Sequence, residues 1–467
     1  MTATMLEPGT HTRARTASDN AVPRAGSATA VVRRTDFETV AQHMLNLMMR
    51  NVATDGFRFE DPVQPGRFST AGCVIAAPSY PANSPGVDQD YVFNWTRDAA
   101  ITAIEIAASS IPAPPAVGVQ PLEDYVRFAA ICQGNAIPTL AHACFTIEGN
   151  SRPWTEQNDG PALQTVAILR AFGQLDEPTQ DLARQVIARN LDFLLGVYQQ
   201  QTTNLWEEHA GHSFFARAAQ LRCFREVVAN TVGVAVPAGC TEAADWLRSA
   251  LDGHWDGSRY LSLIGDTQPP TDPAGPGYDP NIDIVMAAIY GAVPVTDPRL
   301  LATAAELRRQ WSDPASPTVF PVNLADQQLG VGPMLGRYPG DTYDGDVSDP
   351  VQGGHPWALT TCNFAELYYR LAAEVTSGGA VPYDELSAPF LGQAGIAADT
   401  SPQLAAVALE QAGDQMLQAV IYHSDNLELS EQFDGTSGYC RSVSNLTWSY
   451  AAYLSAVRAK TGLAVQG

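Results

Sequence analysis

The chain has 467 residues, of which 45% are hydrophobic and 16% are charged, so we expect a globular protein and not a disordered one. Its 50 acidic residues against 27 basic ones give a formal net charge of −23, which argues against nucleic acid or an anionic membrane as a partner and suits a neutral or cationic small ligand. The chain contains no run of about 18 apolar residues, so we expect no transmembrane segment.

Residues 1–34 are rich in Thr, Ala, Ser and Arg without an apolar core run, and we expect them to form a flexible tail. Arg33-Arg34 is not followed by the hydrophobic region of a twin-arginine signal, so we expect a cytoplasmic protein. The seven cysteines are irregularly spaced and include no Cys-x-x-Cys pair. They favour buried free thiols in a reducing compartment over disulfides or a zinc site, with a thiol nucleophile as a minor alternative.

Helical periodicity recurs from residue 35 to the end, with few strand-like alternations. Several helices have start signals: Asp36 precedes the first, Asp176-Glu177-Pro178 opens the fifth and Ser401-Pro402 opens the eleventh. The pattern predicts about twelve helices, at residues 36–53, 97–110, 121–136, 161–174, 178–199, 212–230, 240–251, 281–290, 297–311, 356–375, 401–423 and 444–462.

Long links rich in Gly, Pro, Asp, Trp and Tyr precede the second, fourth, eighth and tenth predicted helices, and long links in compact domains are usually functional. The alternation indicates six helical hairpins in an inner and an outer ring, which is an all-α (α/α)6 toroid formed by one domain at residues 35–467. Polar and aromatic motifs precede even-numbered helices, so we expect them to line a pocket at one rim; the alternative is that they only cap the barrel. These motifs are Tyr91–Asp98, Trp154–Asp159, Trp206–Glu208, Arg337–Tyr343 and Glu431–Asp434.

The chemistry is expected at the paired acids Glu207 and Glu208, which follow Trp206. Adjacent carboxylates repel each other, and a neighbouring indole removes water from them. Both effects favour a protonated carboxyl, as a general acid near neutral pH requires. The alternative is the first turn of a helix, where acidic residues suit the helix dipole.

The stretch around Tyr91, Trp95, Arg97 and Asp98 combines aromatic rings with an Arg-Asp pair. A sugar needs both, because its apolar ring face stacks on aromatic side chains and its hydroxyls form charge-assisted hydrogen bonds of about 1.5–3 kcal/mol each, accepting from Arg and donating to Asp. A structural salt bridge at a helix start is the other interpretation.

Three further motifs are candidates for the same rim. Trp154 adds an aromatic ring ahead of Asp159, which could be only a helix N-cap. Arg337 lies among tyrosines and could bind a ligand or only stabilise its loop. Glu431, followed along the chain by Trp448, supplies a distant second carboxylate, unless it is an exposed loop acid. His209 and His212 are three residues apart without further ligands, so we expect no metal site and no cofactor.

Taken as a set, these motifs resemble glycoside hydrolase family 15, the glucoamylases, in the family's order over about residues 36–462. The resemblance implies an (α/α)6 barrel of the fungal type without a starch-binding module, and therefore soluble oligosaccharides or small glucosides as substrates. The motifs are Phe-Asn-Trp-Thr-Arg-Asp (93–98), Asp-Gly-Pro-Ala-Leu (159–163), Leu-Trp-Glu-Glu (205–208), Gly-Arg-Tyr-Pro (336–339), Ser-Glu-Gln-Phe-Asp (430–434) and Leu-Thr-Trp-Ser-Tyr (446–450).

The resemblance further implies an exo-acting, inverting glucosidase of the glucan 1,4-α-glucosidase class. Glu207 matches the general acid that protonates the glycosidic oxygen, and Glu431 matches the general base that activates water. Inversion requires these two carboxyls to lie roughly 6.5–9.5 Å apart. The matched substrate-binding positions are Tyr91, Trp95, Arg97, Asp98, Trp154, Trp206, Glu208, Arg337 and Trp448.

The sequence departs from the family pattern on the leaving-group side, around Trp154, at His209-Ala210 and at Gly340. Three hypotheses remain open. The favoured one is a cytoplasmic α-glucoside hydrolase. The second is a repurposed family member that catalyses a non-hydrolytic acid-base reaction in specialised metabolism. The third is a sugar-binding protein without turnover.

Overall fold

The computed structural model describes residues 36–61, 64–78, 91–109, 120–267, 272–346 and 353–462. The contacts of the chain divide it into Met1–Asp36 and Phe37–Gly467. The flexible tail predicted for residues 1–34 lies outside the described residues. The helices and strands of the described residues belong to the second unit.

Each of the twelve predicted helices is present, within a few residues of its predicted ends. The structure adds two short helices that were not predicted, α10 (Pro321–Leu329) and α12 (Ala388–Gln393). The other helices of the described residues are α1 (Phe37–Met49), α2 (Thr96–Ser109), α3 (Gln120–Asn135), α4 (Gly160–Ala171), α5 (Glu177–Val197), α6 (Phe214–Ala229), α7 (Gly239–Asp252), α8 (Asp283–Tyr290), α9 (Pro298–Ser312), α11 (Ala358–Gly378), α13 (Pro402–His423) and α14 (Thr447–Thr461).

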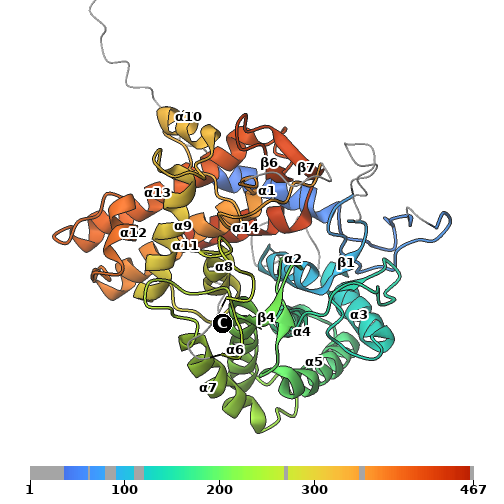
Figure 1. Cartoon of the computed structure of the whole chain (residues 1–467). Coiled ribbons are helices and arrows are strands. Elements are labelled where there is room, and N and C mark those ends of the chain that lie inside the picture. The colour runs from blue at the N-terminus through green and yellow to red at the C-terminus, as the bar shows by residue number, and fades with distance from the viewer. Residues whose placement is uncertain are drawn as a thin grey trace, which may run out of the picture. The chain divides into compact units, whose positions relative to one another are not determined.

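The helices form two concentric rings, as the (α/α)6 prediction requires. In the inner ring α2 contacts α4, α4 contacts α6, α6 contacts α8, α8 contacts α11, α11 contacts α14, and α14 closes the ring on α2. The outer helices pack on this ring: α1 on α14, α3 on α2, α5 on α4, α7 on α6, α9 on α8 and α13 on α11. Figure 1 shows α3, α5 and α7 on the outside of the lower half of the picture. The toroid prediction is therefore confirmed.

Composition explains which helices lie inside. Every residue of α8 is buried, as expected for a helix that is apolar all round. The outer helix α5 buries only one face, and it begins as predicted, with Asp176 accepting a hydrogen bond from the backbone N–H of Thr179. A helix with one polar face must turn that face to water, which places α5 outside the ring.

Short strands fix the loops that enter the inner helices. β1 (Asn94–Trp95) pairs with β2 (Cys144–Phe145). β3 (Thr202–Thr203), β4 (Ala210–Ser213) and β5 (Leu263–Ile264) form a three-stranded sheet. β6 (Ser430–Phe433) and β7 (Cys440–Ser444) form a hairpin with an irregular register between Ser430 and Gln432. These pairings hold distant loops together at the N-terminal ends of the inner helices.

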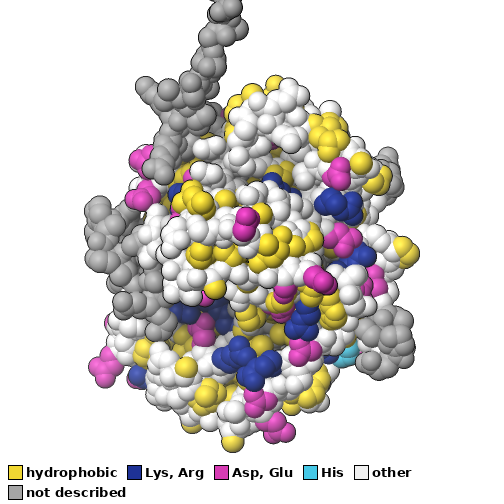
Figure 2. All heavy atoms as spheres, turned by 90° about the vertical axis from the view of Figure 1, so that its left-hand side faces the viewer, with side chains coloured by type: hydrophobic (Ala, Val, Ile, Leu, Met, Phe, Trp, Pro, Cys, Tyr) yellow, Lys and Arg dark blue, Asp and Glu magenta, His cyan; other side chains and the backbone are white. Residues whose placement is uncertain are grey.

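The surface and the thiols agree with the composition. On the face shown in Figure 2, acidic, basic and apolar side chains are interspersed. Among the helices of the described residues, none is long and apolar enough to cross a membrane. All seven cysteines are free, and six of them are buried while Cys440 is half-buried. The prediction of free thiols is thus confirmed.

Candidate active site

Glu207 and Glu208 lie in the turn between β3 and β4, which precedes α6. The side-chain oxygen of Asn204 accepts hydrogen bonds from the backbone N–H groups of Glu208 (3.0 Å) and His209 (3.2 Å). Glu207 has a φ of +66°, a left-handed conformation that is costly for a residue with a Cβ. α6 begins only at Phe214, so the prediction of a helix from residue 212 was two residues too early. The acids belong to a strained turn and not to a first helical turn.

The carboxylate of Glu207 is held by aromatic N–H donors. Its Oε1 accepts from the indole of Trp95 at 2.8 Å, and its Oε2 accepts from the indole of Trp154 at 2.5 Å. The amide of Gln157 lies 3.5 Å from Oε1. Trp95 is buried, whereas 48% of Trp154 is exposed. Trp154 therefore reaches Glu207 even though its motif departs from the family pattern.

Glu431 lies on β6 and is only 4% exposed, so it is not the solvent-exposed loop acid that the sequence left possible. Its Oε1 accepts from the hydroxyl of Tyr91 at 2.7 Å, and its Oε2 accepts from Tyr343 at 3.0 Å and from Ser442 at 2.5 Å. Burial raises the pKa of Glu431, while the hydrogen bonds from Ser442, Tyr91 and Tyr343 oppose that rise by stabilising the carboxylate.

One short path of contacts connects the carboxyls, and a second connects Glu431 to Trp206, the chain neighbour of Glu207. Trp95, which binds Glu207, has its ring centroid 6.3 Å from that of Tyr91, which binds Glu431. On the other side Tyr343, a second partner of Glu431, lies 5.9 Å from Trp357, and Trp357 lies 5.8 Å from Trp206. The two acids are 224 residues apart in the sequence, yet they belong to one connected group of side chains.

Arg97 and Asp98 begin α2 and belong to a buried charged cluster. Arg97 Nη1 donates to Gln157 at 2.7 Å and to Asp159 at 3.1 Å, and Arg97 Nε lies 3.4 Å from Asp98 Oδ2. The guanidinium of Arg97 also lies over the ring of Trp448, 4.9 Å from the centroid. The side chain of Asp159 makes no N-cap bond, so the capping interpretation of Asp159 was wrong.

The acids of this cluster have unused acceptors. Asp98 Oδ2 and Asp159 Oδ1 are buried and accept no hydrogen bond from the described residues. Burial raises the pKa of Asp98 to about 7; Arg97 opposes this rise, and the negative charges of Glu207 and Asp159 add to it. Buried carboxylate oxygens without donors are costly, so they favour a ligand that brings hydroxyl groups.

A second charged cluster surrounds Glu208. Arg337 makes a bidentate pair with Asp341 at 2.8 and 2.6 Å, and its Nη2 lies 2.8 Å from Glu208 Oε1. Tyr338 donates to Glu208 Oε2 at 2.9 Å. The guanidinium of Arg337 also lies 5.3 Å from the ring centroid of Trp206. Arg337 therefore both stabilises its own loop and contacts the site.

Two indoles form the wall between these clusters. The rings of Trp206 and Trp448 are stacked, with centroids 6.5 Å apart and an interplanar angle of 22°. Trp206 is fixed by a hydrogen bond from its indole to Asn281 at 3.0 Å. The structure thus brings together all the predicted site residues, namely Tyr91, Trp95, Arg97, Asp98, Trp154, Trp206, Glu207, Glu208, Arg337, Glu431 and Trp448.

Sequence reasoning missed Gln157, Tyr343, Ser442 and Trp357 as individual contributors. Gln157 and Tyr343 stand inside motifs that the sequence singled out, and their polar character was the available signal. Ser442 and Trp357 carry no local pattern. The two histidines considered for a metal do not converge, because His209 packs edge-on against Tyr278 and His212 pairs with Asp266 at 2.7 Å. Among the described residues no group of three or more metal-ligating side chains forms.

Aromatic rings, paired acids and buried arginines at the N-terminal rim of an (α/α)6 barrel define a carbohydrate-processing enzyme. The chain belongs to Glycosyl hydrolases family 15, whose family model matches residues 42–458. It is therefore a glycoside hydrolase.

Individual relatives agree. The chain is 26% identical over 461 residues to the glucoamylase of Blastobotrys adeninivorans, with 87% of this chain and 70% of that protein covered. It is 28% identical over 408 residues to glucoamylase 1 of Rhizopus oryzae, covering 80% of this chain and 65% of the relative. The solved glucoamylase of Saccharomycopsis fibuligera superposes with a TM-score of 0.73 at 22% identity, covering 92% of this chain and 96% of that one. This last likeness supports the fold.

Proposed function

We propose that the protein releases glucose from the non-reducing ends of soluble α-glucosides by a single, inverting displacement. Glu207 is the general acid and Glu431 is the general base. The observation that carries the proposal is a pair of carboxyls, the half-buried Glu207 and the buried Glu431, which are connected through the contacts of Trp95 and Tyr91. Inversion needs roughly 6.5–9.5 Å between such carboxyls so that a water fits between the base and the sugar. The similarity to glucoamylases supports the substrate class.

In the proposed reaction Glu207 gives its proton to the glycosidic oxygen as the bond to the anomeric carbon breaks. Glu431 takes a proton from a water molecule, and the resulting hydroxide forms the new bond on the opposite face of the ring. The proton lost by Glu207 leaves with the departing alcohol, and the proton gained by Glu431 restores the balance. Each carboxyl must then exchange its proton with solvent before the next turnover.

The remaining residues bind the sugar in this proposal. The unused oxygens of Asp98 and Asp159 accept hydrogen bonds from its hydroxyls, next to the guanidinium of Arg97. The stacked indoles of Trp206 and Trp448 supply an apolar surface for the ring face. We also propose a reducing compartment such as the cytoplasm, which the free thiols support.

The experiment measures glucose release from maltose, isomaltose and an aryl α-glucoside, with the anomer of the first product followed by NMR. We expect β-glucose from the wild type, and a loss of kcat of about 10²-fold or more in Glu207→Gln and Glu431→Gln. Glu410→Gln, on the exposed face of α13, is the matched control and keeps full activity. Glucose release at the wild-type rate by Glu207→Gln would refute its role as the acid.

A further inference from the structure

A cavity lies inside the barrel, away from the acids. Its volume is about 340 Å³, and its lining comes from the middle and the C-terminal ends of α2, α4, α6, α8, α11 and α14. The loops that carry Glu207 and Glu431 enter the N-terminal ends of inner helices. The cavity therefore opens toward the other end of the barrel, and the glycosidase reaction does not use it.

Arginine dominates the walls of this cavity. Arg170, Arg222, Arg370 and Arg458 line it, each from a different inner helix. Their acidic partners in the structure are three glutamates, Glu226, Glu366 and Glu105. Four cationic and three anionic groups leave one excess positive charge, in a protein whose formal net charge is −23. Four arginines at one internal place are therefore unusual for a chain this acidic.

The pairing of the arginines is uneven. Arg170 and Arg222 share a single carboxylate oxygen, Oε1 of Glu226, at 2.9 and 2.7 Å. Arg222 uses its Nη1 on the backbone oxygen of Tyr290 at 2.9 Å. Among the described residues, Nε and Nη1 of Arg170 donate to no acceptor. Two guanidiniums therefore converge on one acceptor while several of their N–H groups have none.

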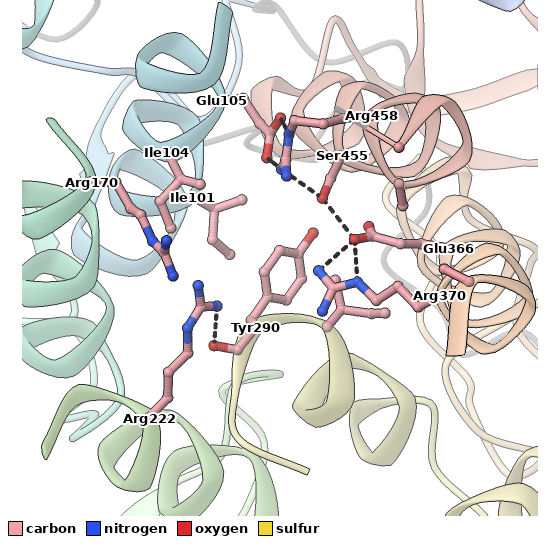
Figure 3. A pocket seen from close by; sticks show the side chains of 14 residues that line it. Ile101, Ile104, Glu105, Arg170, Arg222, Tyr290, Glu366, Arg370, Ser455 and Arg458 are labelled. Atoms are coloured by element: carbon pink, nitrogen blue, oxygen red, sulfur yellow. Dashed lines mark hydrogen bonds and ion pairs between the residues drawn. The ribbon is translucent and has the colours of Figure 1, made fainter. Parts of the chain in front are cut away.

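The guanidinium groups point into the same cavity. In Figure 3 the head groups of Arg170 and Arg222 turn toward each other, and that of Arg370 approaches the ring of Tyr290 from the other side. Burial lowers the pKa of Arg222; Glu226 opposes this lowering, and repulsion from the neighbouring charges of Arg170 and Arg370 adds to it. A neutral ligand would leave this repulsion unchanged, whereas an anion would relieve it.

The helix ends give a competing explanation. The C-terminus of a helix carries partial negative charge, and Arg222 and Arg370 donate to the backbone oxygens of Tyr290 and Ala288 near the end of α8. This role accounts for one nitrogen of each of these two arginines. It does not account for Arg170 or for the volume that the side chains leave unfilled.

We propose that this cavity binds a phosphate dianion, either inorganic phosphate or the phosphate group of a small ester. Guanidinium groups match the oxygens of phosphate with two parallel hydrogen bonds, and three of them can contact one such group from different sides. The available volume accommodates phosphate with a few additional atoms but not a long oligosaccharide. The site is separate from the glycosidase site, and its existence does not depend on the proposed reaction.

The test is calorimetric titration of the whole protein with inorganic phosphate, glycerol 3-phosphate and sodium chloride at matched ionic strength. We expect saturable binding of a phosphate compound at one site and none of chloride. Tighter binding of inorganic phosphate identifies the free ion as the ligand, and tighter binding of the ester identifies an esterified one. Absence of saturable binding by both phosphate compounds overturns the proposal.

Variants locate the site. Arg170→Gln removes a guanidinium with a single hydrogen-bonded partner and should weaken binding about tenfold or more. Arg222→Gln should do the same, and Arg170→Gln keeps the test decisive if Arg222→Gln does not fold. The control is Arg248→Gln, an exposed arginine of α7 paired only with Asp245, which should bind phosphate as the wild type does. Unchanged affinity in Arg170→Gln would place the phosphate elsewhere and refute the assignment.

Discussion

Ser442 offers a direct test of how Glu431 is prepared to act as a base. Its hydroxyl donates to Glu431 Oε2 at 2.5 Å, and both residues are buried. A hydrogen bond to a charged group contributes about 1.5–3 kcal/mol. That free energy favours the carboxylate over the protonated acid, so Ser442→Ala should raise the pKa of Glu431 further.

The sign of the pH effect depends on the role of Glu431. A base must be ionised, and ionisation is lost as the pH falls through its pKa. A loss of about 1.4 kcal/mol reduces the ionised fraction about tenfold at pH values below that pKa. The acidic limb of the kcat/KM profile should therefore move to higher pH in Ser442→Ala, while the alkaline limb stays in place.

A second substitution separates this effect from damage to the fold. Ser442 has a φ of +63°, which glycine adopts readily, so Ser442→Gly removes the same hydroxyl while relieving backbone strain. Both variants should show the same displaced acidic limb, with thermal melting as a check on stability. Ser249→Ala, on the exposed side of α7, is the control. Coincident acidic limbs for the wild type and both variants would show that Ser442 does not stabilise the ionised base.

Three further outcomes are expected. Trp154→Phe keeps an aromatic ring but removes one donor to Glu207, so kcat should fall about tenfold in steady-state assays with little change in KM; an unchanged kcat would contradict the role of this indole. Gly291→Ala places a Cβ 2.6 Å from a side chain of α6, so it should lower the free energy of unfolding by about 1–3 kcal/mol in denaturant titrations. Gly173→Ala is the control, because a Cβ there meets open space and should not lower the free energy of unfolding. Because burial raises the pKa of Asp98 to about 7, its carboxylate is lost as the pH falls through that value, and the dissociation constant of glucose should rise; Asp98→Asn should bind glucose weakly without this pH dependence.

The fold could be predicted because its signals are local. Asp176 and Ser401 cap α5 and α13 through side-chain hydrogen bonds, as their positions in the sequence indicated. α10 was missed although Pro321 opens it and Gly330 ends it in a left-handed conformation. α8 is one residue shorter but apolar almost throughout, whereas α10 has only scattered apolar residues, so the periodicity of α10 is hard to distinguish from a loop.

The site was predictable in its motifs but not in its contacts. Glu431 and Ser442 meet because β6 and β7 form a hairpin with an irregular register, and neither residue carries a signal of that pairing. The conformation of Glu207 depends on Asn204, whose side chain bonds two backbone N–H groups of the same turn. Such geometry arises from specific hydrogen bonds, which composition and periodicity do not report.

The two carboxyls are surrounded by different kinds of donor, and this difference suits their proposed roles. The indoles of Trp95 and Trp154 can only donate, so they stabilise Glu207 after it has given up its proton. The hydroxyls around Glu431 donate to its carboxylate. After rotation they can accept from protonated Glu431, so they form hydrogen bonds with this residue both before and after it takes up a proton. Before the reaction Glu207 carries a proton on one of its two oxygens. That oxygen then donates, so the indole N–H that points at it must move away. The half-exposed Trp154 can turn away at less cost than the buried Trp95, which makes Oε2 the oxygen that we expect to carry the proton.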